Sequence, residues 1–343
     1  MDIKEIKKLA KERMNGLCNL CKECNGVYCA GQVPGMGGTG TGDSFKRNFE
    51  ALKNVKLVLR TMHGAKNPDM SVEVLGEKLE LPLICAPVTG SDINMGGYLS
   101  EQEYCDAVVF GSKKAGTIAM VGDSGKSEFY VAGLDSVKRA GGYGVAVIKP
   151  RENDEVIKRL EMAHEVGVKM VGMDIDGAGL VTMALFGQPV GPKSMEDIAA
   201  IKKATKLPFI LKGIMSSDEA VLAAEAGVDA IVVSNHGGRI LNHTLGAAEV
   251  LPSIARAVKG RVTILADGNV REGADILKYI ALGADAVLAA RPMIWGAVGG
   301  GEDGVKAVID NFKSQLYQAM LLTGCNSVKD IDESRIVNLN AIK

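Results

Sequence analysis

The chain has 343 residues, of which 47% are hydrophobic, and its formal net charge is -1 at pH 7. This length suffices for one large domain with an extension, or for two domains. The near-neutral charge gives no sign of a nucleic-acid partner, and no apolar run approaches the roughly 20 residues that span a membrane. The sequence therefore predicts a soluble, cytoplasmic protein that binds neither nucleic acid nor membranes.

Residues 1–45 are predicted to form an N-terminal extension. Apolar residues at helical spacing, with mixed charges between them, predict an amphipathic helix over residues 1–16 and argue against a signal peptide. Residues 31–42 are rich in glycine and lack periodicity, which predicts a loop. Asp43 is a candidate cap for a short helix that reaches residues 48–52.

Four of the seven cysteines lie close together in this extension, at Cys18, Cys21, Cys24 and Cys29. In a reducing compartment such crowding indicates metal binding rather than disulfides. Gaps of two residues let successive thiolates surround a compact iron–sulfur cluster, whereas zinc ribbons pair two distant knuckles. The spacing favours a [4Fe–4S] cluster, with zinc, or no metal and a redox-reactive loop, as alternatives.

From residue 81 onward, apolar strand-like runs alternate with helix-like stretches. Eight βα units without an antiparallel strand predict an α/β fold, a (β/α)8 TIM barrel over residues 46–343. An open doubly wound sheet is the alternative. The expected strands are Leu83–Ala86, Thr117–Val121, Val145–Ile148, Met170–Met173, Phe209–Leu211, Ile231–Val233, Val262–Leu265 and Ala286–Ala289.

Charged residues follow most of these strands, and in a barrel the residues after the strands meet at one mouth. They include Lys149, Asp174, Asp176 and Lys212. After the last two strands, Asp267-Gly268-Asn269 forms a tight turn into a helix, whose amides favour an anion, and Arg271 and Arg291 add positive charge. This pattern predicts a phosphate site for a flat cofactor, and flavin mononucleotide (FMN) fits.

Three motifs carry a resemblance to a known family. They are Ser234-Asn235-His236-Gly237-Gly238-Arg239, the stretch from Asp267 to Gly273, and Ala290-Arg291-Pro292. With Leu83 to Pro87 and Leu211-Lys212-Gly213, the chain resembles the FMN-dependent α-hydroxy-acid oxidases and dehydrogenases of the glycolate oxidase and lactate oxidase type. The resemblance covers most of the chain and implies oxidation of a 2-hydroxy acid, or a related alcohol, to the 2-oxo product.

The resemblance also implies roles for individual residues. His236 is expected to be the catalytic base, Asp174 the carboxylate that orients it, and Arg239 the ligand of the substrate carboxylate. Lys212 is expected beside the flavin, where its charge stabilises the reduced form. The remaining FMN contacts are expected at Pro87, Val88, Ser234, Asp267, Gly268, Asn269, Arg271, Ala290 and Arg291.

The sequence also departs from the family pattern. The family's active-site tyrosines fall near residues 34–36 and at Ala146, and neither place holds a tyrosine; a second carboxylate-binding arginine is missing from residues 177–181. The residues for deprotonation and flavin binding are thus expected to be present, whereas half of the family's pocket for a small hydroxy acid is missing. This difference suggests a larger or different substrate.

The cysteine segment is not part of the family pattern. A cluster there would take electrons from the flavin and pass them to an acceptor protein. The alternatives are a non-redox FMN isomerase of the type 2 isopentenyl diphosphate isomerase kind, and a non-catalytic electron-transfer or redox-sensing flavoprotein. The family also suggests a homo-oligomer.

Overall fold

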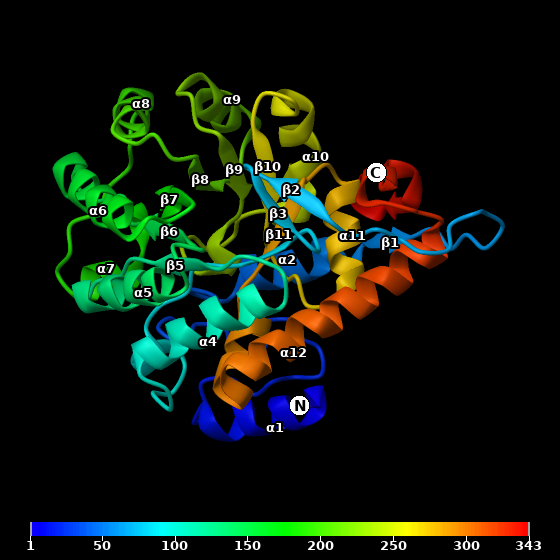
Figure 1. Ribbon diagram of the computed structural model, residues 1–343, viewed down its shortest axis with the longest axis horizontal. Helices are drawn as coiled ribbons and strands as arrows, with labels where there is room; N and C mark the ends of the chain where they lie inside the picture. Colours follow the sequence, from blue (N-terminus) through cyan, green and yellow to red (C-terminus); the bar gives the residue numbers. More distant parts are fainter. Residues whose placement is uncertain (1, 342–343) are drawn as a thin grey trace.

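A computed structural model describes residues 2–341 and shows a closed, eight-stranded parallel barrel (Figure 1). Neighbouring strands pair in the order β4-β11-β10-β9-β8-β7-β6-β5, and a bridge between Cys85 and Ala119 closes the ring. Each predicted run overlaps one strand, so the predicted barrel is confirmed. The strands are β4 (Leu83–Cys85), β5 (Met120–Gly122), β6 (Val145–Ile148), β7 (Met170–Asp174), β8 (Phe209–Ile214), β9 (Ala230–Val233), β10 (Thr263–Ala266) and β11 (Ala286–Ala289).

Alternate residues of each strand belong to two different hydrophobic clusters. Val145 and Val147 of β6 belong to the cluster inside the barrel, together with Ile210 and Val232 from the strands opposite. Ala146 and Ile148 belong to the larger cluster between strands and helices. Because side chains alternate along a strand, the residues that continue the inner rows past the last hydrophobic layer point into the mouth of the barrel.

Helices surround the barrel. Ser216 caps α9 by accepting a hydrogen bond from the amide of Glu219. The last helix, α12, is kinked at Gly301, whose φ is 60°. The helices are α3 (Ser91–Asn94), α4 (Glu101–Lys114), α5 (Ser127–Arg139), α6 (Asn153–Val166), α7 (Val181–Leu185), α8 (Met195–Lys203), α9 (Ser217–Glu225), α10 (Ala247–Val258), α11 (Gly273–Ala281) and α12 (Arg291–Thr323).

The N-terminal extension begins with α1 (Ile3–Arg13), which packs against α12 at the lower edge of Figure 1. The glycine-rich residues 31–42 form turns, as predicted. α2 (Asp43–Lys53) then starts one residue earlier than a cap at Asp43 allows: the N-cap is Gly42, in the left-handed conformation with φ of 71°. Asp43 thus lies in the first turn, where a negative charge favours the helix dipole.

Two small antiparallel pairs complete the fold. They join β1 (Val55–Leu57) to β12 (Ile336–Asn338), and β2 (Val72–Val74) to β3 (Glu77–Leu79). Short 3-10 turns lie near the C-terminus, at Val328–Asp330, Glu333–Arg335 and Leu339–Ala341. Even α12, with 33 residues, lacks the sustained apolar character of a membrane span, and the same holds for every other helix within residues 2–341.

Candidate active site

A cavity with about 1040 Å³ of open space lies at the C-terminal mouth of the barrel. Three groups predicted to do chemistry, Lys212, His236 and Arg239, line it. Eight of the residues predicted to hold the cofactor also line it, namely Pro87, Val88, Asp267, Gly268, Asn269, Arg271, Ala290 and Arg291. Residues predicted from five separate stretches of sequence are therefore brought to one cavity.

His236 stands at the start of η2 (His236–Gly238), the 3-10 turn that follows β9. Its φ is 57°, a left-handed conformation that is uncommon for residues other than glycine and concentrates at functional sites. Its amide donates to Ser234 Oγ at 3.0 Å. Gly238 also has no room for a side chain, because a Cβ there would come within 2.4 Å of the Phe45 nitrogen in α2. The close approach of α2 therefore fixes the turn that presents the histidine.

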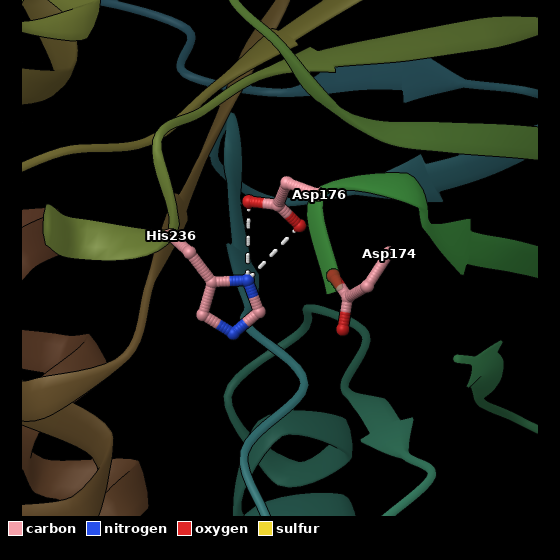
Figure 2. Close-up of side chains that lie close together, drawn as sticks. All are labelled: Asp174, Asp176 and His236. Atoms are coloured by element: carbon pink, nitrogen blue, oxygen red, sulfur yellow. Dashed lines mark hydrogen bonds and ion pairs between the residues drawn. The ribbon is translucent and has the colours of Figure 1, made fainter. Parts of the chain in front are cut away.

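The carboxylate that holds His236 is Asp176, and not Asp174 as the resemblance implied. Nδ1 of His236 lies 3.1 and 3.2 Å from the two Asp176 oxygens (Figure 2). Asp174 ends β7, and Asp176 follows in η1 (Ile175–Gly179). Both residues belong to the inward-pointing row, but only the later one extends far enough beyond the strand to reach the imidazole.

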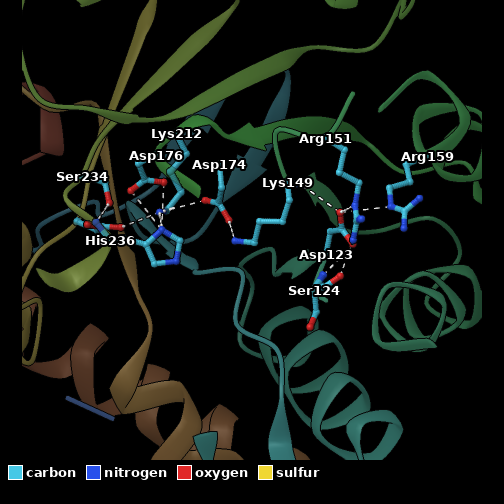
Figure 3. A network of polar contacts seen from close by, with 11 residues as sticks. Asp123, Ser124, Lys149, Arg151, Arg159, Asp174, Asp176, Lys212, Ser234 and His236 are labelled. Atoms are coloured by element: carbon cyan, nitrogen blue, oxygen red, sulfur yellow. Dashed lines mark hydrogen bonds and ion pairs between the residues drawn. The ribbon is translucent and has the colours of Figure 1, made fainter. Parts of the chain in front are cut away.

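Asp174 instead lies between two lysines. Its Oδ2 is 2.6 Å from Nζ of Lys149, and its Oδ1 is 3.1 Å from Nζ of Lys212 (Figure 3). Burial opposes ionisation, but the charges of Lys149 and Lys212 outweigh it and hold the pKa of Asp174 far below its usual range. Asp174 is thus a buried carboxylate that positions two lysines.

Lys212 also lies 3.4 Å from Nδ1 of His236 and 4.0 Å from Asp267. Burial and the charge of Lys212 lower the pKa of His236, so that the imidazole is neutral at neutral pH. Asp174, Asp176 and His236 offer atoms close enough for a cation. Because the Lys212 ammonium already stands among them, the charge of a metal ion would be repelled, and the arrangement suits a neutral base.

Arg239 lies across the cavity, against the N-terminal extension. Its Nη1 donates to the carbonyl oxygens of Gly35 and Gly37, and its Nη2 donates to Oδ1 of Asn94 at 3.1 Å. Asn94 is fixed in turn by the amide of Gly35, at 3.0 Å. Within residues 2–341 the Nε of Arg239 has no hydrogen-bond partner, so it is available for a contact with a carboxylate.

Several buried polar atoms at the β10–β11 end of the cavity have no hydrogen-bond partner within residues 2–341. They are Nε and Nη2 of Arg271, Nη2 of Arg291, Oδ1 of Asp267 and Oδ1 of Asn269. Buried polar groups are normally paired, so unpaired donors beside unpaired acceptors indicate a polar ligand that the protein is built to hold. A phosphate with a polyol chain offers both kinds of partner.

The cysteine segment lies beside this end of the cavity. The charges of Arg271 and Arg291 lower the pKa of Cys24 although burial opposes them. Burial raises the pKa of Cys18 and of Cys29, and Cys29 interacts electrostatically with the other three cysteines. The four thiols therefore form one group. Among the described residues, no three of the four sulfur atoms lie within 4.8 Å of one another.

Three residues of the site were not assigned roles from the sequence. Asp176 and Lys149 carry the signal of a charged residue just after a strand, whereas Asn94 lies in the short α3 and carries none. The sequence also aligned a family tyrosine with Ala146. Ala146 faces the helices, and Lys149 is the residue that follows β6 into the cavity.

Comparisons with known proteins agree with this architecture. The family model described as FMN-dependent dehydrogenase matches residues 35–183 and 180–338. The chain is 32% identical over 323 residues to an L-lactate oxidase of Lacticaseibacillus rhamnosus, with 87% of each chain covered. It is 33% identical over 324 residues to 2-hydroxyacid oxidase 1 of Mus musculus, which covers 84% of this chain and 87% of that protein.

The fold also matches solved structures. A crystal structure of mandelate oxidase with benzoyl-formic acid superimposes with a TM-score of 0.79 at 27% sequence identity, and covers 98% of this chain and 97% of that one. The likeness therefore includes the N-terminal extension as well as the barrel.

Proposed function

Since this chain belongs to the FMN-dependent dehydrogenase family and carries out FMN-dependent 2-hydroxy acid oxidation, we propose that His236 is the base of that reaction. The observation that carries this proposal is the His236–Asp176 pair, held at 3.1 Å on the wall of the cavity, beside Lys212 and in the same cavity as Arg239. Base, orienting carboxylate and two cations then surround one reacting carbon.

Each side chain has a defined task. Arg239 binds the substrate carboxylate through its available Nε and thereby presents C2 to the imidazole. Asp176 accepts a hydrogen bond from Nδ1–H of His236, which leaves Nε2 to accept the substrate proton. After the transfer, Asp176 stabilises the imidazolium. Asp174 positions Lys212 through the ion pair between its Oδ1 and the lysine Nζ.

FMN fits the unpaired atoms at the β10–β11 end. Arg271 and Arg291 would hold its phosphate, Asp267 and Asn269 its hydroxyl-bearing chain, and Pro87, Val88 and Ala290 would pack around the rest. Ser234 is fully buried and does not line the cavity, so it supports the His236 turn and is not placed against FMN. When bound, FMN accepts the two electrons that leave the hydroxy acid. Lys212 would place a positive charge beside the ring.

The test is anaerobic mixing of the FMN-loaded protein with a panel of 2-hydroxy acids, followed by flavin absorbance. At least one acid is expected to bleach the flavin and yield its 2-oxo acid in equal amount. A protein that isomerises its substrate, or that only carries electrons, would keep its flavin oxidised with every acid, and this result would contradict the proposed function.

We further propose that Cys18, Cys21, Cys24 and Cys29 bind a [4Fe–4S] cluster that takes electrons onward to an acceptor protein. Support comes from their spacing in the sequence and from the place of Cys24 beside Arg271 and Arg291. The electrostatics suit thiolate ligands, because two arginines favour the ionised form of Cys24.

Anaerobic purification with iron and sulfide analysis tests this proposal. About four iron atoms and four sulfides per chain are expected, and both should be lost in a variant with Cys21→Ser and Cys24→Ser. Zinc in place of iron, or no metal in a protein with a full complement of FMN, would contradict the proposal.

A further inference from the structure

Lys149 is a buried, positively charged residue on the cavity wall, and the described residues pair only one of its three ammonium donors. Its side chain is only 7% exposed, and it lines the cavity. Nζ makes one hydrogen bond, to Oδ2 of Asp174 at 2.6 Å. An ammonium group has three donors, so two N–H groups of Lys149 have no acceptor within residues 2–341.

Lys149 shares both of its neighbouring carboxylates with other cations. Asp174 is shared with Lys212, which lies 3.1 Å from its other oxygen. Asp123, the acid on the other side, is taken by two arginines: Arg151 Nε lies 2.8 Å and Arg159 Nε 3.3 Å from its Oδ2 (Figure 3). The ion pair with Asp174 uses only one donor of the buried Lys149 ammonium, and the two remaining donors favour an anionic acceptor in the cavity that Lys149 lines.

The backbone holds Lys149 rigidly at this place. The amides of Ser124 and Lys149 both donate to the Asp123 carboxylate, at 2.7 and 3.2 Å. Ser124 also lines the cavity. Gly177 has no side chain where a Cβ would come within 3.2 Å of Lys149 Cδ, so the chain after β7 packs directly on the lysine stem.

Two cationic positions therefore face one cavity from different elements. Arg239 follows β9 and is fixed by the loop of the N-terminal extension, whereas Lys149 follows β6 and is fixed by β7 and the Asp123 network. A ligand whose carboxylate is bound by Arg239, and whose C2 faces His236, can extend its other end toward Lys149.

We propose that Lys149 binds a second carboxylate of the substrate, so that the preferred substrate is a 2-hydroxy dicarboxylic acid. The proposal rests on the proposed function, because it places the first carboxylate at Arg239. Lys149 then acts as a specificity-determining residue, since it distinguishes substrates by the far end of the molecule.

The test compares acids of equal chain length that differ in the terminal group. Anaerobic flavin reduction is measured with 2-hydroxyglutarate and 2-hydroxyvalerate, and kcat/KM is determined for each. A hydrogen-bonded charge pair predicts a preference of about tenfold to a hundredfold for the dicarboxylate. In Lys149→Met this preference should disappear, and in Lys149→Arg it should remain.

The matched control is Lys158→Met, because Lys158 is an exposed lysine of α6, with 66% of its side chain accessible. This control should keep the full preference for the dicarboxylate. Equal kcat/KM for the two acids in the wild type, or a preference that survives Lys149→Met, would overturn the proposal.

A binding measurement separates this proposal from the reaction itself. If no hydroxy acid reduces the flavin, the proposed function fails, and the second-carboxylate site is then tested with unreactive glutarate and valerate through the flavin absorbance. Glutarate should bind the wild type about tenfold more tightly than valerate, and Lys149→Met should remove the difference. Equal binding in the wild type would overturn the site.

Discussion

The two halves of the barrel mouth differ in how closely they follow the family. Strands β8 to β11 present Lys212, His236, Asp267 and Arg291, all of them predicted from the motifs and all brought together at one cavity or its wall. Strands β5 to β7 present Lys149 and Asp174 in a buried ionic network where the family's tyrosine and arginine are missing. Under the proposed function, one half holds the cofactor and transfers the proton, and we propose that the other half selects the substrate.

The sharpest way to test this division is to replace the two aspartates that lie two residues apart. Asp176→Asn should lower the rate of flavin reduction by about a hundredfold or more, because the imidazolium loses its partner. Asp174→Asn should lower the free energy of unfolding by about 3 kcal/mol, because it leaves two buried lysines without their counter-ion. Stopped-flow kinetics and chemical denaturation of both variants measure this contrast. If Asp174→Asn slows flavin reduction and Asp176→Asn does not, the assignment of Asp176 as the partner of His236 is wrong.

The cofactor end can be tested through affinity. Arg271→Met should weaken FMN binding by about tenfold to a hundredfold, because the phosphate loses a charge-assisted hydrogen bond. Fluorescence titration of the flavin-free protein gives the dissociation constant. Arg261→Met is the control, since Arg261 is exposed and outside the cavity. An unchanged dissociation constant for Arg271→Met would place the phosphate elsewhere.

The pH profile of kcat/KM reports the charge around the base. Burial and Lys212 lower the pKa of His236, so the base stays neutral to a lower pH than a free histidine, whose value is about 6.5. The acid limb of the profile is therefore expected below that value. Lys212→Met removes one cause of the lowering and should move the limb to higher pH. A shift in the opposite direction would show that the limb does not belong to His236.

Substitutions in the cysteine segment are expected to have the smallest effect on the reduction of FMN by the substrate. Cys21→Ser should change the rate of FMN reduction by substrate by less than about twofold, because Cys21 lies outside the cavity. The same variant should lose the iron and slow electron transfer to a one-electron acceptor. If flavin reduction falls together with the iron, the extension also takes part in the chemistry.

The barrel could be predicted because every one of its strands is a short apolar run, buried on both faces, and strand ends meet at one mouth. The motifs that contain His236, Lys212 and Arg239 follow such strands, so these three residues could also be predicted to lie at the mouth. Sequence could not separate Asp174 from Asp176, since both point inward and only the depth of each in the mouth decides which reaches the imidazole.

Other residues depended on tertiary contacts that leave no local pattern. Asn94 contacts Arg239 from a short helix 145 residues away in the chain. The sequence placed Lys149 at the barrel mouth but gave it no role, because one residue of register in β6 decides which side chain points to the barrel and which to the helices.

The central claim is that His236 removes the substrate proton while the rest of the cavity holds the cofactor and the acid. Single-turnover reduction of FMN by a hydroxy acid in His236→Ala tests it most directly. The variant should bind FMN as tightly as the wild type and yet reduce it about a thousandfold more slowly or not at all. Reduction at the wild-type rate, with FMN bound, would contradict the account.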